Sequence, residues 1–130
     1  MNVLLDTHIF LWFISGDPRL PDFMRENIQN PDHDVYLSVV SLWEVIVKYQ
    51  LGKLALPYPP ESYLPEQRAK HHIASLTLHE TAVARLVTLP SIHRDPFDRM
   101  IICQALEHDL TLITVDSVMG RYPVKILRAS

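Results

Sequence analysis

The stretch from Asp95 to Asp116 restricts the fold more than any other part of the chain. Its sequence, DPFDRMIICQALEHDLTLITVD, predicts a helix that begins at an acid–proline pair, then a tight turn, then a buried strand. The strand, residues 111–115, is apolar and β-branched without alternation, which is typical of a strand covered on both faces in a parallel sheet. This stretch therefore indicates a sheet with helices on both sides.

The same alternation of apolar strands and helices runs along the whole chain. The other predicted strands span residues 3–5, 35–38, 73–76 and 124–127, and the other predicted helices span residues 7–15, 21–29, 41–52, 61–70 and 79–87. This order predicts a three-layer α/β/α sandwich with a mainly parallel sheet. With 130 residues and no repeats or low-complexity tracts, the chain is expected to form a single domain over residues 1–130.

The composition restricts the cellular compartment in which the protein is expected and the class of partner that it is expected to bind. No apolar run is long enough to cross a bilayer and no secretory leader is present, so we expect a cytoplasmic protein without a membrane partner. The single cysteine, Cys103, excludes an internal disulfide and is expected in the core. A net charge of -3 argues against nonspecific coating of nucleic acid but permits a local basic rim.

The predicted helix over residues 7–15 is, apart from His8, apolar nearly all round. A short helix without a polar face must be buried by other apolar groups. The sequence leaves two alternatives open, burial within the monomer core or burial against a subunit or partner protein.

Four acids occupy comparable places in the predicted fold. Asp6 follows the first strand, Glu44 lies early in the helix after the second, Asp98 begins the central helix, and Asp116 follows a late strand. Parallel strands place these exits at one edge of the sheet, where ligands bind in open α/β proteins. Carboxylates held together repel unless they are protonated or neutralised, and oxygen ligands suit Mg²⁺ or Mn²⁺. Such a site activates water and stabilises phosphoryl charge, as in a metal-dependent nuclease.

Each acid also has a structural interpretation. Ser41 and Glu44 fit the S-x-x-E capping box, in which the glutamate only satisfies a backbone N–H group. The other acids sit where N-caps and dipole-facing carboxylates are common: Asp6, Asp95, Asp98 and Asp116. The acids taken singly leave this alternative open, whereas their joint placement favours a shared site.

Four segments, NVLLDTH, SVVSLWEVIVKYQLGKL, HRDPFDRMIICQAL and LTLITVD, follow one another over nearly the whole chain. Together they resemble PIN-domain ribonucleases, particularly the VapC toxins of toxin–antitoxin pairs. The resemblance implies an endoribonuclease that uses Mg²⁺ or Mn²⁺, acts on RNA, is inhibited by a cognate antitoxin and forms a homodimer.

By motif, the resemblance places the family's acidic cluster at Asp6 of LLDTH, Glu44 of SLWEV, Asp98 of DPFDRMII and Asp116 of TVD. Thr114 matches a polar position that supports the cluster. In the resulting hypothesis, the first three acids hold a divalent ion that bridges to the scissile phosphate and deprotonates its attacking water. Asp116 completes the cluster or a second ion site.

Other polar residues near these motifs receive supporting roles. Asp95 is an additional acid, for which we favour helix capping or orientation of a neighbouring ligand over direct ligation. Thr7 either orients Asp6 or caps the first helix. His8 and His93 lie beside the acids and either contact substrate or are ordinary polar residues. Four cations are candidates for phosphate contacts with RNA: Lys48, Arg94, Arg99 and Arg121.

Two alternatives to the nuclease belong to other classes. A catalytically silent PIN-like module would bind an antitoxin or RNA without cleaving it, but the presence of all four acids disfavours this alternative. Another Mg²⁺-dependent phosphohydrolase on a similar scaffold is compatible with the acids alone. The resemblance, rather than the spacing of the acids, favours the ribonuclease.

Overall fold

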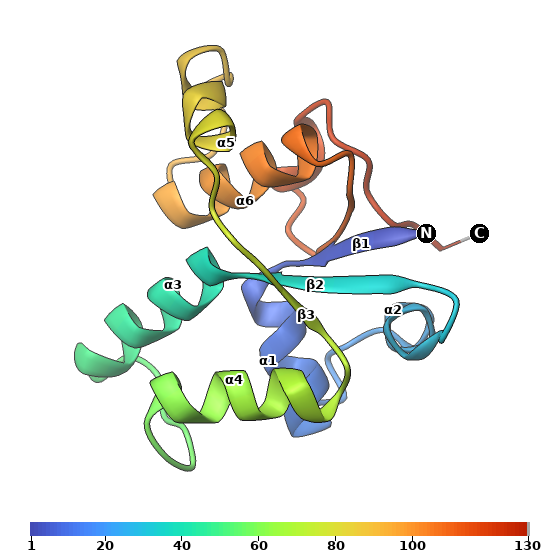
Figure 1. The fold of residues 1–130 in the computed structure, drawn as a ribbon, viewed down its shortest axis with the longest axis vertical. Helices are drawn as coiled ribbons and strands as arrows, with labels where there is room; N and C mark the ends of the chain where they lie inside the picture. The colour runs from blue at the N-terminus through green and yellow to red at the C-terminus, as the bar shows by residue number, and fades with distance from the viewer. Residues whose placement is uncertain (130) are drawn as a thin grey trace.

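The computed structural model describes residues 1–129 and organises them around a four-stranded sheet (Figure 1). The strands are β1 (Asn2–Leu5), β2 (Asp34–Ser38), β3 (Ala74–Leu76) and β4 (Thr111–Ile113), and their order is β3-β2-β1-β4. All three pairings are parallel, and Val3 of the central strand β1 lies between Val35 and Thr111. The carboxyl ends of the strands therefore meet at one edge.

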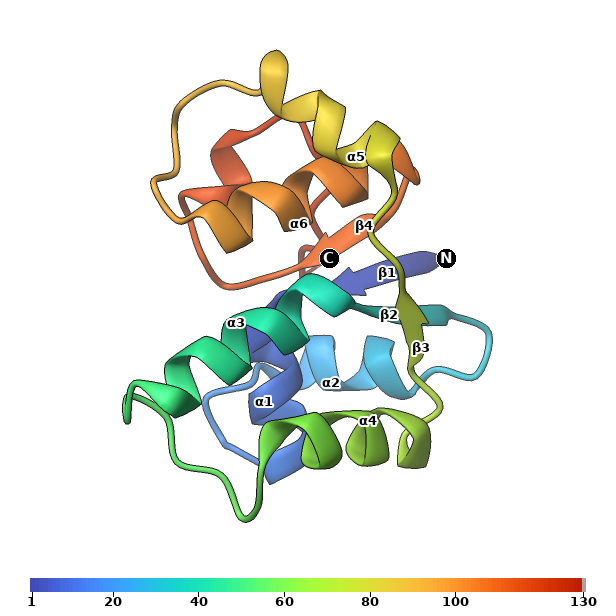
Figure 2. The ribbon, with the colours of Figure 1, turned by 60° about the vertical axis from the view of Figure 1, so that its left-hand side comes forward.

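Helices cover both faces of this sheet. Figure 2 shows α1 (Thr7–Ser15), α2 (Asp22–Gln29) and α4 (Pro60–Lys70) on one side, with α5 (Glu80–Ala84) and α6 (Pro96–Glu107) on the other. Helix α3 (Val39–Gln50) continues directly from β2 and contacts α1, α4 and α6. Two 3-10 turns complete the chain, η1 (Arg85–Val87) and η2 (Met119–Arg121). The predicted three-layer arrangement with a parallel sheet is confirmed.

The central strand shows why no alternation was visible in the sequence. Successive side chains of a strand point to opposite faces. Val3 and Leu5 pack against α1 and α2, whereas Leu4 packs against α6, and all three are fully buried. Because both faces are covered, every position is apolar. Each such side chain contributes about 1.5–3 kcal/mol by leaving water.

Two predicted strands near the C-terminus were wrong in extent. The strand predicted over residues 111–115 ends at Ile113, because Thr114 turns its hydroxyl toward Asp6 and Val115 is exposed. Residues 124–127 form an isolated parallel bridge, between Ile126 and Leu112, instead of the predicted final strand.

Helix α3 begins two residues earlier than predicted. The hydroxyl of Ser38 is its N-cap and accepts a hydrogen bond from the Val40 N–H at 3.0 Å. Ser41 and Glu44 therefore lie inside the helix, and the capping-box interpretation is wrong. The helix ends at Gln50, and Gly52 follows the cap in the left-handed region at φ +72, which glycine adopts without strain.

The remaining predicted elements agree with the structure within a residue or two, except that the helix predicted over residues 79–87 divides into α5 and η1. Cys103 is fully buried on α6, as predicted, and burial raises the pKa of its thiol. Among the helices of residues 1–129, none combines the length and the apolar character that a membrane span requires.

Candidate metal centre

The predicted acids gather at the edge where the strands end. Asp6 directly follows β1, and Asp98 lies in the first turn of α6. Single oxygen atoms of Glu44, Asp95 and Asp98 lie within 4.8 Å of one another. Atoms of His93, Asp98 and Asp116 form a second such group, so Asp98 belongs to both. Side chains from α3, from residues 93–98 and from the turn after β4 thus meet around Asp98. Asp6 is in neither group, but it is close enough for its charge to act on Asp98.

Asp6 is the most unusual of these acids because one of its oxygens is buried without a partner. The residue is only 4% exposed, and its Oδ2 accepts a hydrogen bond of 2.8 Å from Thr114 Oγ1. Its Oδ1 has no hydrogen-bond partner among the described residues. Asp6 occupies the N-cap position of α1, yet its side chain makes no capping hydrogen bond. Helix capping therefore does not explain this carboxylate, whereas a cation beside Oδ1 would satisfy it.

Glu44 is 1% exposed and both of its oxygens are engaged. Oε1 accepts a hydrogen bond of 2.7 Å from Thr7 Oγ1, and the same hydroxyl lies 2.8 Å from Ser41 Oγ. Oε2 accepts one of 2.5 Å from Lys48 Nζ. The Thr7 hydroxyl thus orients Glu44 rather than Asp6, and Thr7 does not cap α1, whose N-cap position is occupied by Asp6. Ser41 was missed as a site residue because its spacing from Glu44 was assigned to a cap.

Asp95 has the capping role that we favoured. As the N-cap of α6, its Oδ1 accepts hydrogen bonds from the N–H groups of Phe97 at 2.8 Å and Asp98 at 3.2 Å. Pro96 follows at the first helical position, where the missing N–H is harmless. The cap fixes where α6 starts, and thereby where Asp98 faces the other acids.

Burial and mutual repulsion change the protonation of the acids. Burial, followed by the charges of Asp6, Asp95 and Glu44, raises the pKa of Asp98 to about 7. Burial likewise raises the pKa of Asp6. Without a cation, Asp98 is therefore partly protonated near neutral pH, and a divalent ion would take the place of its proton.

Asp116 is held by both main-chain and side-chain groups. Its Oδ1 accepts a hydrogen bond of 2.8 Å from the Val118 N–H, and its own N–H donates to Thr114 Oγ1 at 3.0 Å. Thr114 therefore contacts both Asp6 and Asp116, a geometry that fits the supporting position assigned to it. Partial burial raises the pKa of Asp116, but hydrogen bonds from His93 and Val118 outweigh burial and leave the pKa below its ordinary value.

His93 contacts two of the acids, a role that sequence reasoning did not assign. Its Nε2 lies 2.9 Å from Asp116 Oδ2 and 3.2 Å from Asp98 Oδ2, and its side chain is 15% exposed. The available signal was its position two residues before Asp95 in the HRDPFDR run. That signal indicates proximity to the acids but not which atoms meet.

The four candidate phosphate-contacting cations lie in different environments. Lys48 is paired with Glu44, and the Arg99 guanidinium donates to the Pro90 carbonyl at 3.0 Å. Burial lowers the pKa of Lys48, but its hydrogen bond to Glu44 and the negative charges of Glu44, Asp95 and Asp98 together outweigh burial, so the net pKa is raised. Arg94 and Arg121 are exposed to solvent.

The donor set suits a hard divalent cation. Carboxylate oxygens dominate the cluster, and such ligands favour Mg²⁺ or Mn²⁺ over metals that prefer thiolate. Asp6, Glu44 and Asp98 converge from three elements, and the unpartnered Asp6 Oδ1 supplies a ready ligand atom. The residues therefore fit a divalent metal.

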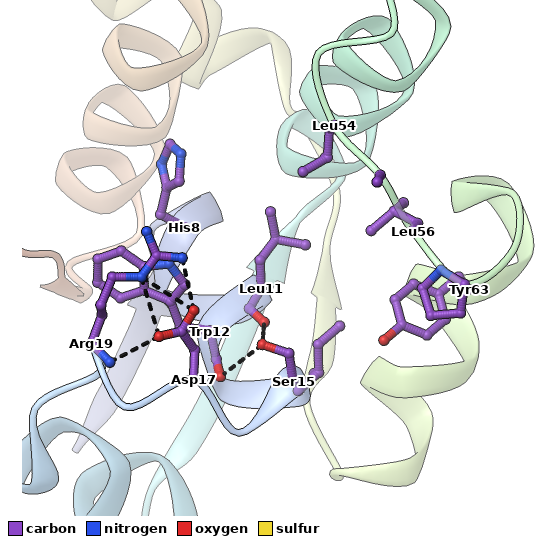
Figure 3. Close-up of a pocket in the computed structure, with 12 residues that line it drawn as sticks. His8, Leu11, Trp12, Ser15, Asp17, Arg19, Leu54, Leu56 and Tyr63 are labelled. Atoms are coloured by element: carbon purple, nitrogen blue, oxygen red, sulfur yellow. Dashed lines mark hydrogen bonds and ion pairs between the residues drawn. The ribbon is translucent and has the colours of Figure 1, made fainter.

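The apolar sequence of α1 left open whether this helix is buried in the monomer core or against a partner. Ile9, Phe10 and Phe13 are buried in the core. Its other side, with Leu11 and Trp12, lines a groove of about 450 Å³ opposite Leu54, Leu56 and Tyr63 (Figure 3). The Arg19 guanidinium lies 5.0 Å from the centre of the Trp12 ring. Core burial thus accounts for one face of α1, and the other face borders an open groove.

Known proteins share this sequence and fold. The sequence profile of the PIN domain matches residues 3–125. Ribonuclease VapC22 of Mycobacterium tuberculosis is 30% identical over 116 residues, which make up 88% of this chain and 87% of that protein. VapBC2 from Rickettsia felis, solved bound to a DNA fragment from the promoter, has a TM-score of 0.71 at 18% identity and covers 98% of both chains. A toxin-antitoxin complex from Klebsiella pneumoniae has a TM-score of 0.64 at 18% identity, covering 97% of this chain and 96% of its counterpart.

The fold and the site together define the class of protein. It is an α/β/α sandwich with carboxylates clustered at the ends of its parallel strands. Within that class, the chain belongs to the PIN-domain family.

Proposed function

We propose that this protein is a metal-dependent endoribonuclease and the toxin of a type II toxin–antitoxin pair. The observation that carries the proposal is the buried, unpartnered Oδ1 of Asp6 beside Glu44 and Asp98. RNA as the substrate is supported by the relatives, which are named ribonucleases. A toxin acting on cellular RNA would work in the cytoplasm.

In this proposal, Asp6, Glu44 and Asp98 hold Mg²⁺ or Mn²⁺ through carboxylate oxygens. A bound ion of this kind lowers the pKa of coordinated water and neutralises charge on a phosphoryl group. Thr114 fixes Asp6 and Thr7 fixes Glu44, so neither carboxylate must reorganise when it ligates. Asp98 gives up its proton on binding, and Asp116 completes the cluster beside it.

The RNA backbone is proposed to cross this edge of the sheet. Arg94 precedes α6, which carries Asp98, and Arg121 follows the Asp116 turn, so both exposed cations flank the acids along the chain. Cations at such positions attract phosphates without reading the sequence. Lys48 would become available for the same purpose if Glu44 exchanged it for a metal ion.

The test is incubation of the purified protein with total RNA, with Mg²⁺, with Mn²⁺, or with a chelator, followed by mapping of the cut ends. We expect cleavage that requires a divalent ion and falls at least about 100-fold in Glu44→Gln, which keeps the shape and one acceptor oxygen but loses the charge and the second acceptor. The exposed acid Asp22 provides a matched control, since Asp22→Asn should cleave normally. Cleavage in chelator, or a fully active Glu44→Gln variant, would contradict the proposal. Intact RNA in every condition would favour the silent binding module.

We also propose a cognate antitoxin as the partner that occupies the α1 groove. The groove is lined mainly by apolar side chains, and the similar Klebsiella pneumoniae structure is a toxin-antitoxin complex. An apolar antitoxin segment would cover Leu11, Trp12 and Leu54 (Figure 3). The check is copurification with the product of a short adjacent reading frame. Leu54→Asp should abolish copurification, and Leu51→Asp, outside the groove, should not.

A further inference from the structure

The loop before α6 is held rigidly by the hydroxyl of Tyr122. Tyr122 is buried, and its Oη accepts hydrogen bonds from the N–H groups of Ile92 at 3.1 Å and His93 at 2.7 Å. Two main-chain donors on one buried oxygen leave little freedom to the backbone at His93. The imidazole therefore has a defined place between Asp98 and Asp116.

The hydrogen bonds of His93 determine its tautomer. The main-chain N–H of Asp95 lies 3.1 Å from His93 Nδ1 and can only donate, so Nδ1 must carry a lone pair. The single proton of the neutral ring is then on Nε2, an assignment that follows from the hydrogen-bond network. Nε2 faces carboxylates, which accept this proton.

This tautomer excludes His93 as a metal ligand in the same geometry. A nitrogen that carries a proton has no lone pair for a metal. To free Nε2, the proton would have to move to Nδ1, where it would meet the N–H of Asp95. His93, Asp98 and Asp116 have the spacing of a metal site, but the imidazole is placed to donate.

We propose that His93 is a positioning residue: it donates its Nε2–H to Asp116, faces Asp98, and so fixes the relative position of these two carboxylates for the metal site. The importance of this position rests on the proposed function, because Asp98 also belongs to the group with Glu44 and Asp95. The hydrogen bond to Asp116 Oδ2 is 2.9 Å, and Asp98 Oδ2 lies 3.2 Å from the same nitrogen. Without this donor, the carboxylates of Asp98 and Asp116 would face each other directly, and Asp116 would still accept the hydrogen bond from the Val118 N–H, so Asp98 would be the one to turn away.

A matched pair of variants separates the two nitrogens of the ring. His93→Asn offers an oxygen near the place of Nδ1, so it retains an acceptor for the Asp95 N–H and loses the donor to the acids. His93→Gln offers an amide N–H near the place of Nε2, so it retains that donor. We expect Mn²⁺ affinity, measured by calorimetry, to fall about 10- to 100-fold in His93→Asn, as for other partners of metal ligands. His93→Gln should restore most of the affinity, and His79→Asn, an exposed control, should bind as the parent does.

A second measurement is independent of RNA cleavage and of metal affinity. Long-range ¹H–¹⁵N correlation spectra of the histidine rings should show His93 as the Nε2–H tautomer, both without metal and with Mg²⁺. Parental Mn²⁺ affinity in His93→Asn, weaker binding by His93→Gln than by His93→Asn, or the Nδ1–H tautomer would overturn the proposal. If the parent failed to bind metal, the proposed nuclease would be in doubt, and the tautomer spectrum would still decide the role of His93.

Discussion

Two side chains of different mobility, Thr7 and Lys48, donate hydrogen bonds to the carboxylate of Glu44. Thr7 is buried, so its hydrogen bond to Oε1 is fixed, whereas the Lys48 side chain is 35% exposed and can swing into solvent. Next to Lys48 lies a cavity of about 270 Å³, lined also by His8 and Lys53, that offers it room. In the metal-free protein, the Lys48 ammonium therefore offsets part of the negative charge that a metal would otherwise neutralise.

Replacing Lys48 with methionine tests this account. Lys48→Met leaves Glu44 Oε2 without its donor, so we expect the metal-free protein to lose about 1–3 kcal/mol of stability. Added Mg²⁺ should recover that loss, giving a larger rise in Tm for the variant than for the parent. Thermal unfolding with and without Mg²⁺ measures both effects, and Lys53→Met, an exposed neighbour, is the control. Equal Mg²⁺-induced shifts in parent and variant would show that Lys48 does not compete with the ion.

The raised pKa of Asp98 predicts how stability depends on pH. Its pKa is about 7 in the folded protein and near the ordinary 3.8 when unfolded, so the folded state binds more protons between these values. The contribution of Asp98 to stability is therefore present at low pH and is lost as pH rises toward 7. Asp116, whose pKa is lowered, acts in the opposite sense but at lower pH.

We therefore expect the Tm of the metal-free protein to fall between about pH 4 and about pH 7. Mg²⁺ should reverse this trend, because the ion binds better once Asp98 has lost its proton. Thermal scans across this range, repeated with Asp98→Asn, provide the measurement. If the variant kept the same pH slope as the parent, another group would be responsible.

The acids themselves were predictable from the sequence, but their partners were not. Asp6 and Asp116 could be identified because each directly follows a predicted apolar strand. The contact between Thr7 and Glu44 joins residues 37 positions apart, and no local pattern encodes it. The same holds for His93, whose place between two acids depends on the Tyr122 hydroxyl far along the chain.

At the scale of elements, the predicted helices and strands agree with the structure where a regular apolar pattern extends over a long stretch of sequence. Two of the errors lie where a polar side chain contacts the site or a neighbouring element instead of continuing its own element. Strand β4 stops at Ile113 because Thr114 turns toward Asp6, although the run of β-branched residues continues. Helix α3 starts at Val39 because Ser38 caps it, and that serine also reaches α6.

Ser38 joins two elements, so its removal should cost more than an ordinary cap. Its Oγ accepts from the Val40 N–H and donates to Gln104 Oε1, which is fully buried. For Ser38→Ala, we expect a loss of about 2–4 kcal/mol, the sum of a lost cap and a buried acceptor left unpaired. Urea unfolding measures the loss, with the exposed Ser117→Ala as control. A loss below about 0.5 kcal/mol would mean that water replaces the hydroxyl.

At the scale of the whole molecule, two apolar surfaces remain uncovered within residues 1–129. One is the α1 groove, and the other surrounds Trp43, which is 57% exposed and packs edge-to-face on Phe97 with ring centres 4.9 Å apart. Leu86 and Met100 flank this pair around a cavity of about 320 Å³. Exposed aromatic surface of this kind is typical of a protein interface. The expected homodimer offers a second copy of the same surface to cover it.

Truncating Trp43 tests whether this surface joins two copies. A tryptophan at the centre of an interface contributes at least about 2 kcal/mol, so Trp43→Ser should weaken dimerisation about 30-fold or more. Sedimentation across a concentration series measures the change. Leu51→Ser is a matched control, because Leu51 follows the same helix and is 63% exposed but lies outside the patch. A parent that stays monomeric at every concentration, or equal association of both variants, would show that the Trp43 surface does not join two copies.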